Sequence, residues 1–430
     1  MPEPDLEQLQ RQHIETLQQR YSKALVETGY DALLISSGAA PMRYADDHGY
    51  PFQGYGPFLH WTGLTGLENS WLLIQPGQGA RLQVHTPDDF WHASAALPDE
   101  AWARDLAVEG SVETAPPLPV LSTQLAVLGD PLTLAGVPGD HNPPALVTAV
   151  EATRIHKTEY EIACLAEANS RAAEGHRAAR AAFLAGESEF GISLAYQQAT
   201  QQRESEAPYH SIIGLNDHAG ILHYQFYDVV APEVSRSLLI DAGYRYRGYG
   251  SDITRTWAGP GQGEFQALLV GLEALQKRLC QAVAPGVDFV ALHRKTHLGL
   301  AALLSSAGVV KGMDEEAMVA EGITRAFFPH GLGHLLGVQV HDVGGKPVPS
   351  PADAPFLRLT RTLEPGMVVT IEPGLYFIPS LLAPVLAGPL RHHLNQGLID
   401  ILSGCGGIRI EDNVVVTAEG GHNLTRACLP

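Results

Sequence analysis

The spacing of apolar residues along the first third of the chain predicts one helix followed by several strands. Six apolar residues recur near the N-terminus at helical spacing: Leu6, Leu9, Ile14, Leu17, Tyr21 and Leu25. This pattern predicts an amphipathic helix over residues 5–27. Four short apolar runs follow, DALLISS, SWLLIQ, ARLQVH and LAVLG, separated by clusters of Gly, Pro and Asp. Runs of this kind are typical of the strands of an α/β domain.

The hydrophobic pattern changes after the segment GVPGDHNPP, which is rich in Gly and Pro. From Lys157 onward the apolar positions become helical, and further helices are predicted over residues 188–203, 262–283 and 288–306. Strand-like runs return in SLLIDAG, SDITRTWAG, VVTIEPG and GGIRIEDNVVVT. Helices and strands without strict alternation indicate an α+β arrangement. We therefore predict an α/β domain over residues 1–155 and an α+β domain over residues 156–430.

Composition narrows the class of protein. The chain has 430 residues, 45% of them hydrophobic and 17% charged, so it is a globular protein larger than one ordinary core. The net charge of -19 and the lack of a dense Lys/Arg run argue against binding to nucleic acid. No run approaches the roughly 20 apolar residues of a membrane helix. Four widely spaced cysteines and a polar N-terminus lead us to expect a cytoplasmic protein.

Three predicted strands of the second domain carry an acid inside or at the end of an apolar run. These acids are Asp241 in SLLIDAG, Glu372 in VVTIEPG and Glu411 in GGIRIED. A fourth acid, Asp252, follows Asp241 across the turn-rich segment YRYRGYG. This spacing predicts a hairpin that brings the two aspartates close together.

Buried carboxylates need compensation, because an ionised carboxylate without a partner is very costly in a protein interior. Each acid by itself could pair with a nearby arginine such as Arg245, Arg255 or Arg409. Four such pairs at one place are harder to arrange than two divalent cations, whose charge balances four carboxylates. Bridging acids would hold such ions roughly 3.5–4 Å apart, as in two-metal hydrolases, and the ions would lower the pKa of a bound water toward about 7.

The segment PHGLGHLLGVQVHD places three histidines, His330, His334 and His341, within a short stretch. The first two have the spacing of zinc ligands on a helix, but the flanking glycines are poor helix residues and the glutamate of an H-E-x-x-H motif is absent. Glycine lets the backbone approach a ligand closely. One of these histidines could supply the nitrogen ligand of the predicted site, and carboxylates with imidazole suit Mn(II), Fe(II), Co(II) or Zn(II).

Five motifs in this order resemble those of the pita-bread metallopeptidases: LLIDAG, SDITRT, FFPHGLGH, VTIEPGLYF and GGIRIEDN. Within that family, GLGHLLGVQVHDVGG, IEPGLYFIPSLL and ILHY are most similar to the bacterial Xaa-Pro dipeptidases (prolidases), a group close to organophosphorus acid anhydrolase. The resemblance spans nearly the whole chain. It implies a pita-bread catalytic domain preceded by a smaller, creatinase-like α/β domain that contributes to substrate access and dimerisation.

The resemblance also implies roles for individual residues. Five positions match the family's metal ligands: Asp241, Asp252, His334, Glu372 and Glu411. Glu372 also matches the residue that moves a proton, and His341 one that assists the tetrahedral intermediate. Five more match residues that contact the substrate: His223, His330, Arg409, Tyr209 and Asp47. Arg409 could also neutralise the ligand carboxylates, and Asp47 lies on a loop that would reach a pocket across a dimer interface.

The expected reaction is therefore the hydrolysis of Xaa-Pro dipeptides by a homodimer that holds two divalent ions per chain, with Mn(II) favoured. Slow hydrolysis of organophosphate triesters is an expected side activity, because the tetrahedral intermediate resembles their phosphorus centre. Two alternatives stay open: an exopeptidase of the aminopeptidase P type, and a peptide-binding domain that has lost its metals. Creatinase, which shares the fold and works without metals, is a more distant one.

Overall fold

The computed structural model describes residues 5–91, 96–119 and 124–430, and the chain forms two compact units. The first comprises the residues up to Cys164 together with Arg247–Tyr249, and the second comprises Leu165–Tyr246 and Gly250–Pro430. For comparison, the sequence predicted a boundary at residue 155. Each unit has its own sheets and core.

The first unit is built around a six-stranded sheet with the order β4-β3-β2-β1-β5-β6. Its elements are α1 (Leu6–Thr28), β1 (Ala32–Ser36), α2 (Gly56–Thr62), β2 (Trp71–Ile74), β3 (Arg81–His85), η1 (Ala101–Asp105), β4 (Ala107–Ser111), β5 (Leu125–Leu128), β6 (Asp140–His141) and α3 (Pro144–Ala152). The central strand β1 pairs antiparallel with β2 and parallel with β5, so the sheet is mixed. The predicted N-terminal helix and the four predicted strands are therefore all present.

Helix α1 forms because its apolar residues fall on one face, and that face covers the sheet. Leu17, Tyr21 and Leu25 are fully buried against residues of β1 such as Leu33 and Ile35. The helix begins at Asp5, whose side chain accepts a hydrogen bond from the N–H of Glu7, and it ends at Gly29 in the left-handed conformation. Every residue of β1 is buried, as expected for a strand covered on both faces.

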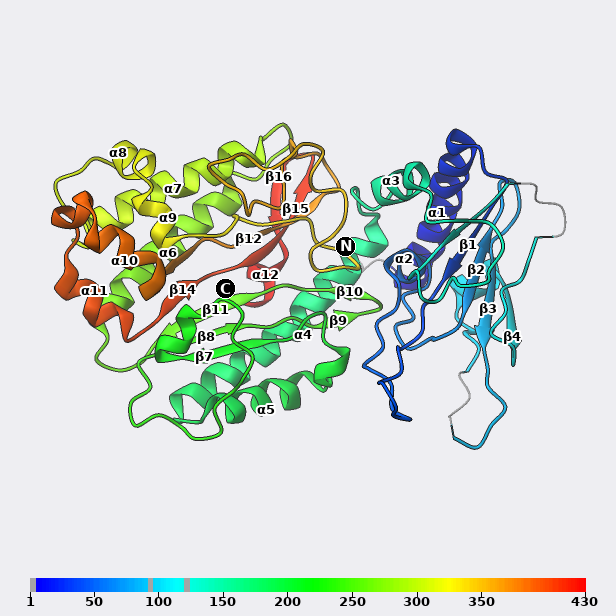
Figure 1. Ribbon diagram of the computed structural model, residues 1–430, viewed down its shortest axis with the longest axis horizontal. Helices are drawn as coiled ribbons and strands as arrows, with labels where there is room; N and C mark the ends of the chain where they lie inside the picture. The colour runs from blue at the N-terminus through cyan, green and yellow to red at the C-terminus, as the bar shows by residue number, and fades with distance from the viewer. Residues whose placement is uncertain (1–4, 92–95, 120–123) are drawn as a thin grey trace. The chain divides into compact units, whose positions relative to one another are not determined.

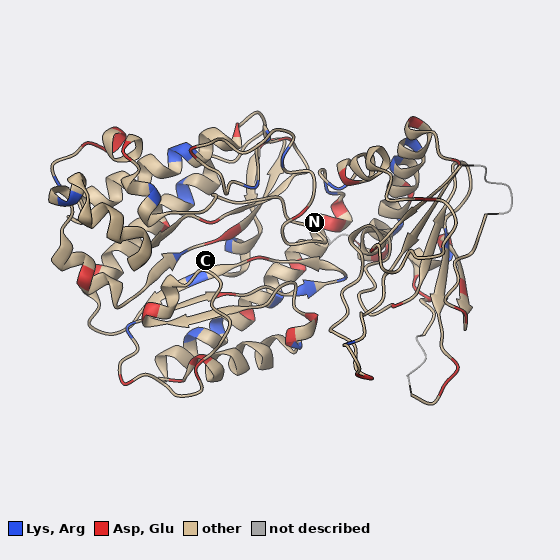
Figure 2. Cartoon of the chain, viewed as in Figure 1, with Lys and Arg blue, Asp and Glu red and all other residues tan. Residues whose placement is uncertain are grey.

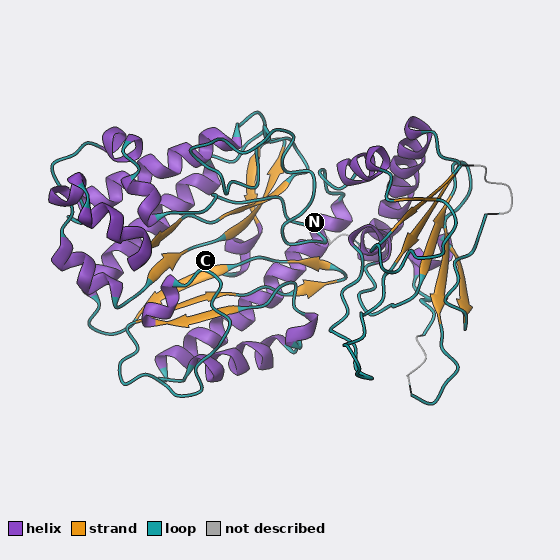
Figure 3. Cartoon of the chain, viewed as in Figure 1, coloured by secondary structure: helices purple, strands orange, loops and turns teal. Residues whose placement is uncertain are grey.

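The second unit contains short sheets between two groups of helices (Figures 1 and 3). Its strands are β7 (Ile212–Leu215), β8 (Ser237–Asp241), β9 (Arg245–Tyr246), β10 (Tyr249–Gly250), β11 (Thr254–Ala258), β12 (Val368–Ile371), β13 (Gly374–Tyr376), β14 (Gly407–Arg409), β15 (Asp412–Thr417) and β16 (Gly420–Asn423). They form the sheets β11-β8-β7, β12-β15-β16, β13-β14 and β10-β9. The residues of β9 and β10 are divided between the two units.

Long helices pack against these strands. The helical segments are α4 (Glu159–Leu184), α5 (Glu189–Thr200), η2 (Glu204–Glu206), η3 (Asn216–Gly220), α6 (Gly263–Gln281), α7 (Phe289–Ser306), α8 (Glu315–Ala320), α9 (Ile323–Phe327), α10 (Pro379–Ala387), η4 (Pro389–His393), α11 (Gln396–Ser403) and α12 (Leu424–Cys428). Phe183 of α4 and Tyr196 of α5 pack with Ile213 of β7 and Ile240 of β8 in one core. Within the described ranges, no helix is long and apolar enough to cross a membrane.

Two features of the second unit differ in detail from the prediction. The run GGIRIEDNVVVT was predicted as one strand, but it forms β14 and β15, with Ile410 and Glu411 between them. Because of this break, Glu411 belongs neither to the sheet β13-β14 nor to the sheet β12-β15-β16. The predicted pairing around Asp241 is present: β8 and β11 are antiparallel, with Asp241 opposite Thr254.

The first residue of β15, Asp412, is held by the buried Arg255 and the partly buried Arg426. Its Oδ1 lies 2.8 Å from Nη2 of Arg255, and its Oδ2 lies 2.8 Å from Nε of Arg426. Arg255 also donates to the backbone carbonyl of Glu411, at 2.8 Å. Burial would raise the pKa of Asp412, but Arg255 and Arg426 hold it at about 2. This ion cluster fixes the backbone at Glu411.

We expect Asp412→Asn to destabilise the second unit by about 3–5 kcal/mol, because it leaves two arginines without their buried counter-charge. The midpoint of urea unfolding measures the change. Asp400→Asn removes an exposed acid on α11 and serves as the control. Equal midpoints for the two variants would contradict the structural role of Asp412.

Candidate metal centre

The predicted acids converge because each lies at the end of a strand or beside one. Asp241 ends β8, and Asp252 lies two residues before β11. Glu372 follows β12 directly, and Glu411 lies between β14 and β15. The four acids therefore come from elements whose backbones are fixed by ladders and caps. A rigid backbone is what a site with defined geometry needs.

His334 reaches the same place because its segment runs beside β12. The N–H of Thr370 donates to the carbonyl of His334 at 3.0 Å, and the N–H of Glu372 donates to the carbonyl of Leu332 at 2.8 Å. Between them, Gly333 lies so close that a Cβ there would be 2.0 Å from the carbonyl oxygen of Thr370. The glycine in PHGLGH is therefore required by this close backbone contact, which brings His334 to the acids.

The side chains of Asp252, His334 and Glu411 meet in the interior. Each offers one ligand atom, and these atoms all lie within 4.8 Å of one another. Nε2 of His334 is 3.3 Å from Oδ2 of Asp252 and 3.6 Å from Oε1 of Glu372. Asp241 belongs to the same group electrostatically, since burial raises its pKa, Arg409 opposes this shift, and the charge of Asp252 adds to it.

The imidazole of His334 is oriented as a metal ligand. Its Nδ1 lies 2.9 Å from the carbonyl of Leu335, so Nδ1 carries the hydrogen and Nε2 keeps its lone pair in the neutral ring. Nε2 is buried and makes no hydrogen bond within the described part of the chain. A buried ring nitrogen without a partner, facing carboxylates, has the chemistry of an open coordination position. The residues thus fit divalent ions.

Burial and mutual repulsion disturb the acids strongly. Burial, with the charges of Asp252 and Glu372, raises the pKa of Glu411 well above its usual range. Burial also raises the pKa of Glu372 to about 7, although His334 opposes the shift. Burial acts on Asp252 in the same direction, but the imidazole of His334, together with Tyr209 and His341, lowers its pKa overall. Without bound ions, protons must therefore occupy some of these carboxylates.

Arginine compensates only part of this negative charge. Arg409 is buried and donates from Nη2 to Oδ2 of Asp241 at 2.8 Å, so one of the four acids has an arginine partner. Tyr209 donates to Oδ1 of the same carboxylate at 2.7 Å. Arg255, another arginine near these acids in the sequence, pairs with Asp412 instead. The charge on the remaining acids is left for cations to balance.

A residue that the sequence reasoning did not select connects Arg409 to His330. The hydroxyl of Tyr376 accepts from Nη1 of Arg409 at 2.9 Å and lies 2.8 Å from Nε2 of His330. Nδ1 of His330 lies 2.9 Å from the carbonyl of Gly331, so Nδ1 donates and Nε2 accepts from Tyr376. Burial and Arg409 lower the pKa of His330 to about 3, which keeps this ring neutral. The only sequence signal was that Tyr376 lies within the motif VTIEPGLYF.

The remaining predicted residues of the second unit lie around this centre. His341 packs edge-on against His334, with ring centroids 4.3 Å apart. Burial, then His334 and Arg358, lower the pKa of His341 to about 4, and His223 adds to the effect. His223 and Arg358 are both exposed. Arg358 is a second residue that sequence reasoning missed, because it lies outside the quoted motifs.

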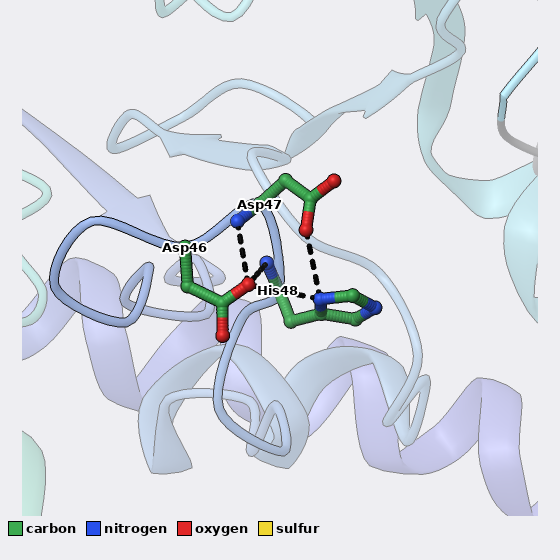
Figure 4. A group of neighbouring side chains, drawn as sticks. All are labelled: Asp46, Asp47 and His48. Atoms are coloured by element: carbon green, nitrogen blue, oxygen red, sulfur yellow. Dashed lines mark hydrogen bonds and ion pairs between the residues drawn. The ribbon is translucent and has the colours of Figure 1, made fainter.

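Asp47 belongs to the first unit, so its predicted contact with the substrate stays a prediction. It lies on an exposed loop with Asp46 and His48 (Figure 4). Nδ1 of His48 is 2.9 Å from Asp47 and 3.0 Å from Asp46, so the three side chains pair with one another. Elsewhere Lys and Arg are spread over many elements among the acids (Figure 2), as expected from a sequence without basic runs.

Both units of the chain match families of known proteins. Residues 163–418 match the model of Metallopeptidase family M24, and residues 8–151 match that of the Xaa-Pro dipeptidase N-terminal domain. The chain is 65% identical over 428 residues to a Xaa-Pro dipeptidase of Marinobacter nauticus, which covers 100% of both chains. A Xaa-Pro dipeptidase of Cronobacter sakazakii is 42% identical over 432 residues, with 97% of this chain and 98% of that one covered.

The fold has solved counterparts. Proline aminopeptidase P II from Yersinia pestis superposes with a TM-score of 0.71 at 26% identity, covering 96% of both chains. Its likeness over nearly the whole chain confirms the predicted pita-bread fold with a preceding N-terminal domain.

The pKa shifts predict how metal binding depends on pH. Glu372 has a raised pKa of about 7 in the folded, ion-free chain, against an ordinary value of 4.5. Between pH 4.5 and pH 7, the folded chain therefore keeps a proton on Glu372 that the unfolded chain has lost. Its contribution to stability is present at low pH and is lost as pH rises toward 7. The raised pKa of His334 acts in the same direction. An ion that replaces these protons should therefore stabilise the fold more at higher pH.

We expect the gain in melting temperature on adding manganese, relative to a chelator, to be larger at about pH 8 than at about pH 6. Each displaced proton contributes up to about 1.4 kcal/mol per pH unit. Thermal denaturation in both conditions measures the gain. Buried histidines elsewhere, such as His13 with its lowered pKa of about 4, titrate in the same way with and without metal. Their contribution therefore cancels in the difference between the two melting temperatures. A gain independent of pH would contradict the displacement of protons.

Proposed function

The chain belongs to metallopeptidase family M24 and is a metal-dependent Xaa-Pro dipeptidase, and we propose that its divalent ions are held by the five residues at the strand ends. The ligands of this proposal are Asp241, Asp252, His334, Glu372 and Glu411. The observation that carries it is the buried group Asp252, His334 and Glu411, whose ligand atoms lie within 4.8 Å of one another. When bound, the ions would supply Lewis acidity and lower the pKa of a water.

Glu372 is the residue proposed to move the proton. The reaction adds water to the carbonyl of the first residue, and the bond to the proline nitrogen breaks. Glu372 would accept the proton that the water loses, and deliver it to the proline nitrogen, which must be protonated to leave. Its side chain is less deeply buried than that of His334, at 17% against 3% exposure, so one carboxylate oxygen can face the substrate.

His341 and His330 are proposed to contact the substrate near this carboxylate. His341 lies against His334 and is exposed, so its N–H can donate to the oxygen that gains negative charge. Nδ1 of His330 lies 3.7 Å from Oε2 of Glu372. Its hydrogen bond to Tyr376 fixes the ring plane. Tyr209 and His223 complete the proposed pocket on this unit, and Asp47 would join it from a partner subunit.

The carboxylate of the substrate's proline needs a basic partner, and two arginines are candidates. Arg409, the residue expected from the sequence, is committed through three donors to Asp241, Tyr376 and Thr254. We therefore assign it to orienting Asp241 and Tyr376 around the bound substrate. Arg358 is exposed, and its charge acts on His341, so we assign the substrate carboxylate to Arg358. An arginine there explains a preference for dipeptides, because a longer peptide has no carboxylate at that position.

Manganese, a homodimer and a cytoplasmic location complete the proposal. The oxygen-rich ligand set with one imidazole favours Mn(II) over soft metals, and Co(II), Fe(II) or Zn(II) would also fit. All four cysteines are free, which agrees with a reducing compartment. Hydrolysis of organophosphate triesters stays a predicted side activity of the same centre.

We expect manganese-dependent release of proline from Ala-Pro, with little cleavage of a tripeptide that begins Ala-Pro. Glu411→Ala removes a proposed ligand and should lower the activity by more than about 100-fold. Losing a metal ligand should reduce activity more than losing a residue that only hydrogen-bonds to a ligand. Glu419→Ala, an exposed acid after β15, is the matched control and should retain activity. Preferential cleavage of the tripeptide would indicate the aminopeptidase P alternative. Absence of both metal and activity would indicate a peptide-binding domain.

We expect Arg358→Met to raise KM for Ala-Pro by about 10-fold, because a hydrogen bond to a charged group contributes roughly 1.5–3 kcal/mol. The variant should also lose most of the discrimination between Ala-Pro and its C-terminal amide. Steady-state kinetics on both compounds measure this. Lys346→Met removes another exposed cation from the same loop and controls for general charge. If Arg358→Met kept full discrimination, the assignment of the carboxylate to Arg358 would be wrong.

A further inference from the structure

The segment that carries His223 is long and largely irregular. It runs from the end of β7 at Leu215 to the start of β8 at Ser237, and η3 is its only helical turn among the described residues. Several of its apolar side chains are exposed, including Phe226 at 85% and Val230 at 75%. Tyr224, the neighbour of His223, is nevertheless buried and packs with Leu239 and Tyr376. The loop around His223 is therefore held by this contact and by polar interactions.

A buried carboxylate supplies these interactions. Glu189 begins helix α5 and is only 1% exposed. Its Oε1 accepts from the N–H of Leu215 and from Nδ1 of His218, each at 2.8 Å. Its Oε2 accepts from the hydroxyl of Tyr224 at 2.7 Å and from the N–H of Asp228 at 2.8 Å. One side chain thus binds four points of the loop.

The four donors explain why an acid can be buried here. An ionised carboxylate accepts only, and both of its oxygens are matched with two donors each. The N-terminal end of α5 adds favourable electrostatics for a negative charge. A second contact ties the same helix end to the loop, because the N–H of Phe190 donates to the carbonyl of Asp228 at 3.1 Å. Glu189 is therefore a charged anchor placed on a rigid helix.

The anchored loop leads directly to the pocket. Tyr224, which donates to Glu189, is the neighbour of His223 in the chain and stacks on His218 with ring centroids 4.4 Å apart. Tyr224 also packs in one buried cluster with Tyr376, whose hydroxyl bonds to His330 and Arg409 beside the centre. Movement of the loop would therefore move His223 relative to the proposed substrate and leave the five metal ligands in place.

We propose that Glu189 is a positioning residue for substrate binding, acting through the loop Leu215–Asp228 to hold His223 at the proposed substrate pocket. The inference rests on the proposed dipeptidase function and adds a specificity determinant that lies outside the metal centre and contacts neither metal nor substrate.

The variant Glu189→Gln is nearly isosteric and tests this role. In either orientation of the amide, its NH₂ replaces an oxygen that faces a backbone N–H, either that of Leu215 or that of Asp228. A backbone N–H cannot turn to accept, whereas the hydroxyl of Tyr224 can. The loop thus loses at least one anchor while the volume of the side chain is unchanged.

We expect Glu189→Gln to raise KM for Ala-Pro by about 10-fold, with kcat and manganese content within about twofold of the parent values. His223→Ala should raise KM by a similar factor. The double variant should be no worse than His223→Ala alone, because coupled residues give non-additive effects. Glu187→Gln changes an exposed acid two residues away and should leave the kinetics unchanged. If Glu189→Gln folds poorly, Tyr224→Phe removes one anchor and should show a smaller rise in KM, again absent in the His223→Ala background.

Independent, multiplicative effects of Glu189→Gln and His223→Ala would overturn the proposal, since they would indicate a purely structural role for Glu189. An unchanged KM would overturn it as well. Parent protein loaded with manganese that does not cleave Ala-Pro would overturn the proposed function, and this inference with it. Because parent activity and the coupling between variants are separate readouts, the two failures are distinguishable.

Discussion

The mutual repulsion of carboxylates in the interior of the second unit is the constraint on which the rest of the structure depends. Burial raises the pKa of Glu411 and Glu372, and the negative charges of the neighbouring acids raise both pKa values further. Protons, an arginine or metal ions can relieve this repulsion. The structure provides one arginine contact, to Asp241, and a histidine nitrogen that faces the acids without a hydrogen bond within the described chain. Divalent ions would balance the negative charge that remains, which agrees with the match to Metallopeptidase family M24.

The fold holds these charges together by making their backbones rigid. Gly333 permits the chain around His334 to lie against β12, and Arg255 with Asp412 fixes the backbone next to Glu411. The outer contacts follow the same principle. Tyr376 joins Arg409 to His330, and Glu189 joins four points of the loop that carries His223. The proposed ligands and the proposed substrate contacts are therefore positioned by buried polar interactions, and Arg409 takes part in both sets.

The proposed roles lead us to expect two kinds of effect at this site. Changes at the proposed ligands should alter ion binding, because they alter the balance of charge in a dry interior. Changes in the loop around His223 or at Arg358 should alter which substrate is held, because these side chains are exposed around the centre. The exposed group Asp46, Asp47 and His48 in the first unit has neither the burial nor the unpartnered nitrogen of the metal centre.

The sequence by itself located most of the elements and indicated a set of candidate ligands. The period of apolar residues located α1, α6, α7 and the strands β8, β11 and β12, since burial of one face or both leaves a regular signal. An acid inside or at the end of an apolar run marked Asp241, Glu372 and Glu411, because a buried charge is tolerated only with a partner, and hairpin spacing marked Asp252. Strands without this signal, such as the exposed β4, were missed.

Only the tertiary structure decided how the other side chains are used. The break between β14 and β15, the partners of Arg409 and the roles of Tyr376, Arg358 and Glu189 depend on contacts between residues far apart in the chain. Arg409 and Asp241, for example, are brought to 2.8 Å across 168 positions. No local pattern encodes such a contact, because a hydrogen bond depends on where two side chains end in space and not on their neighbours in sequence.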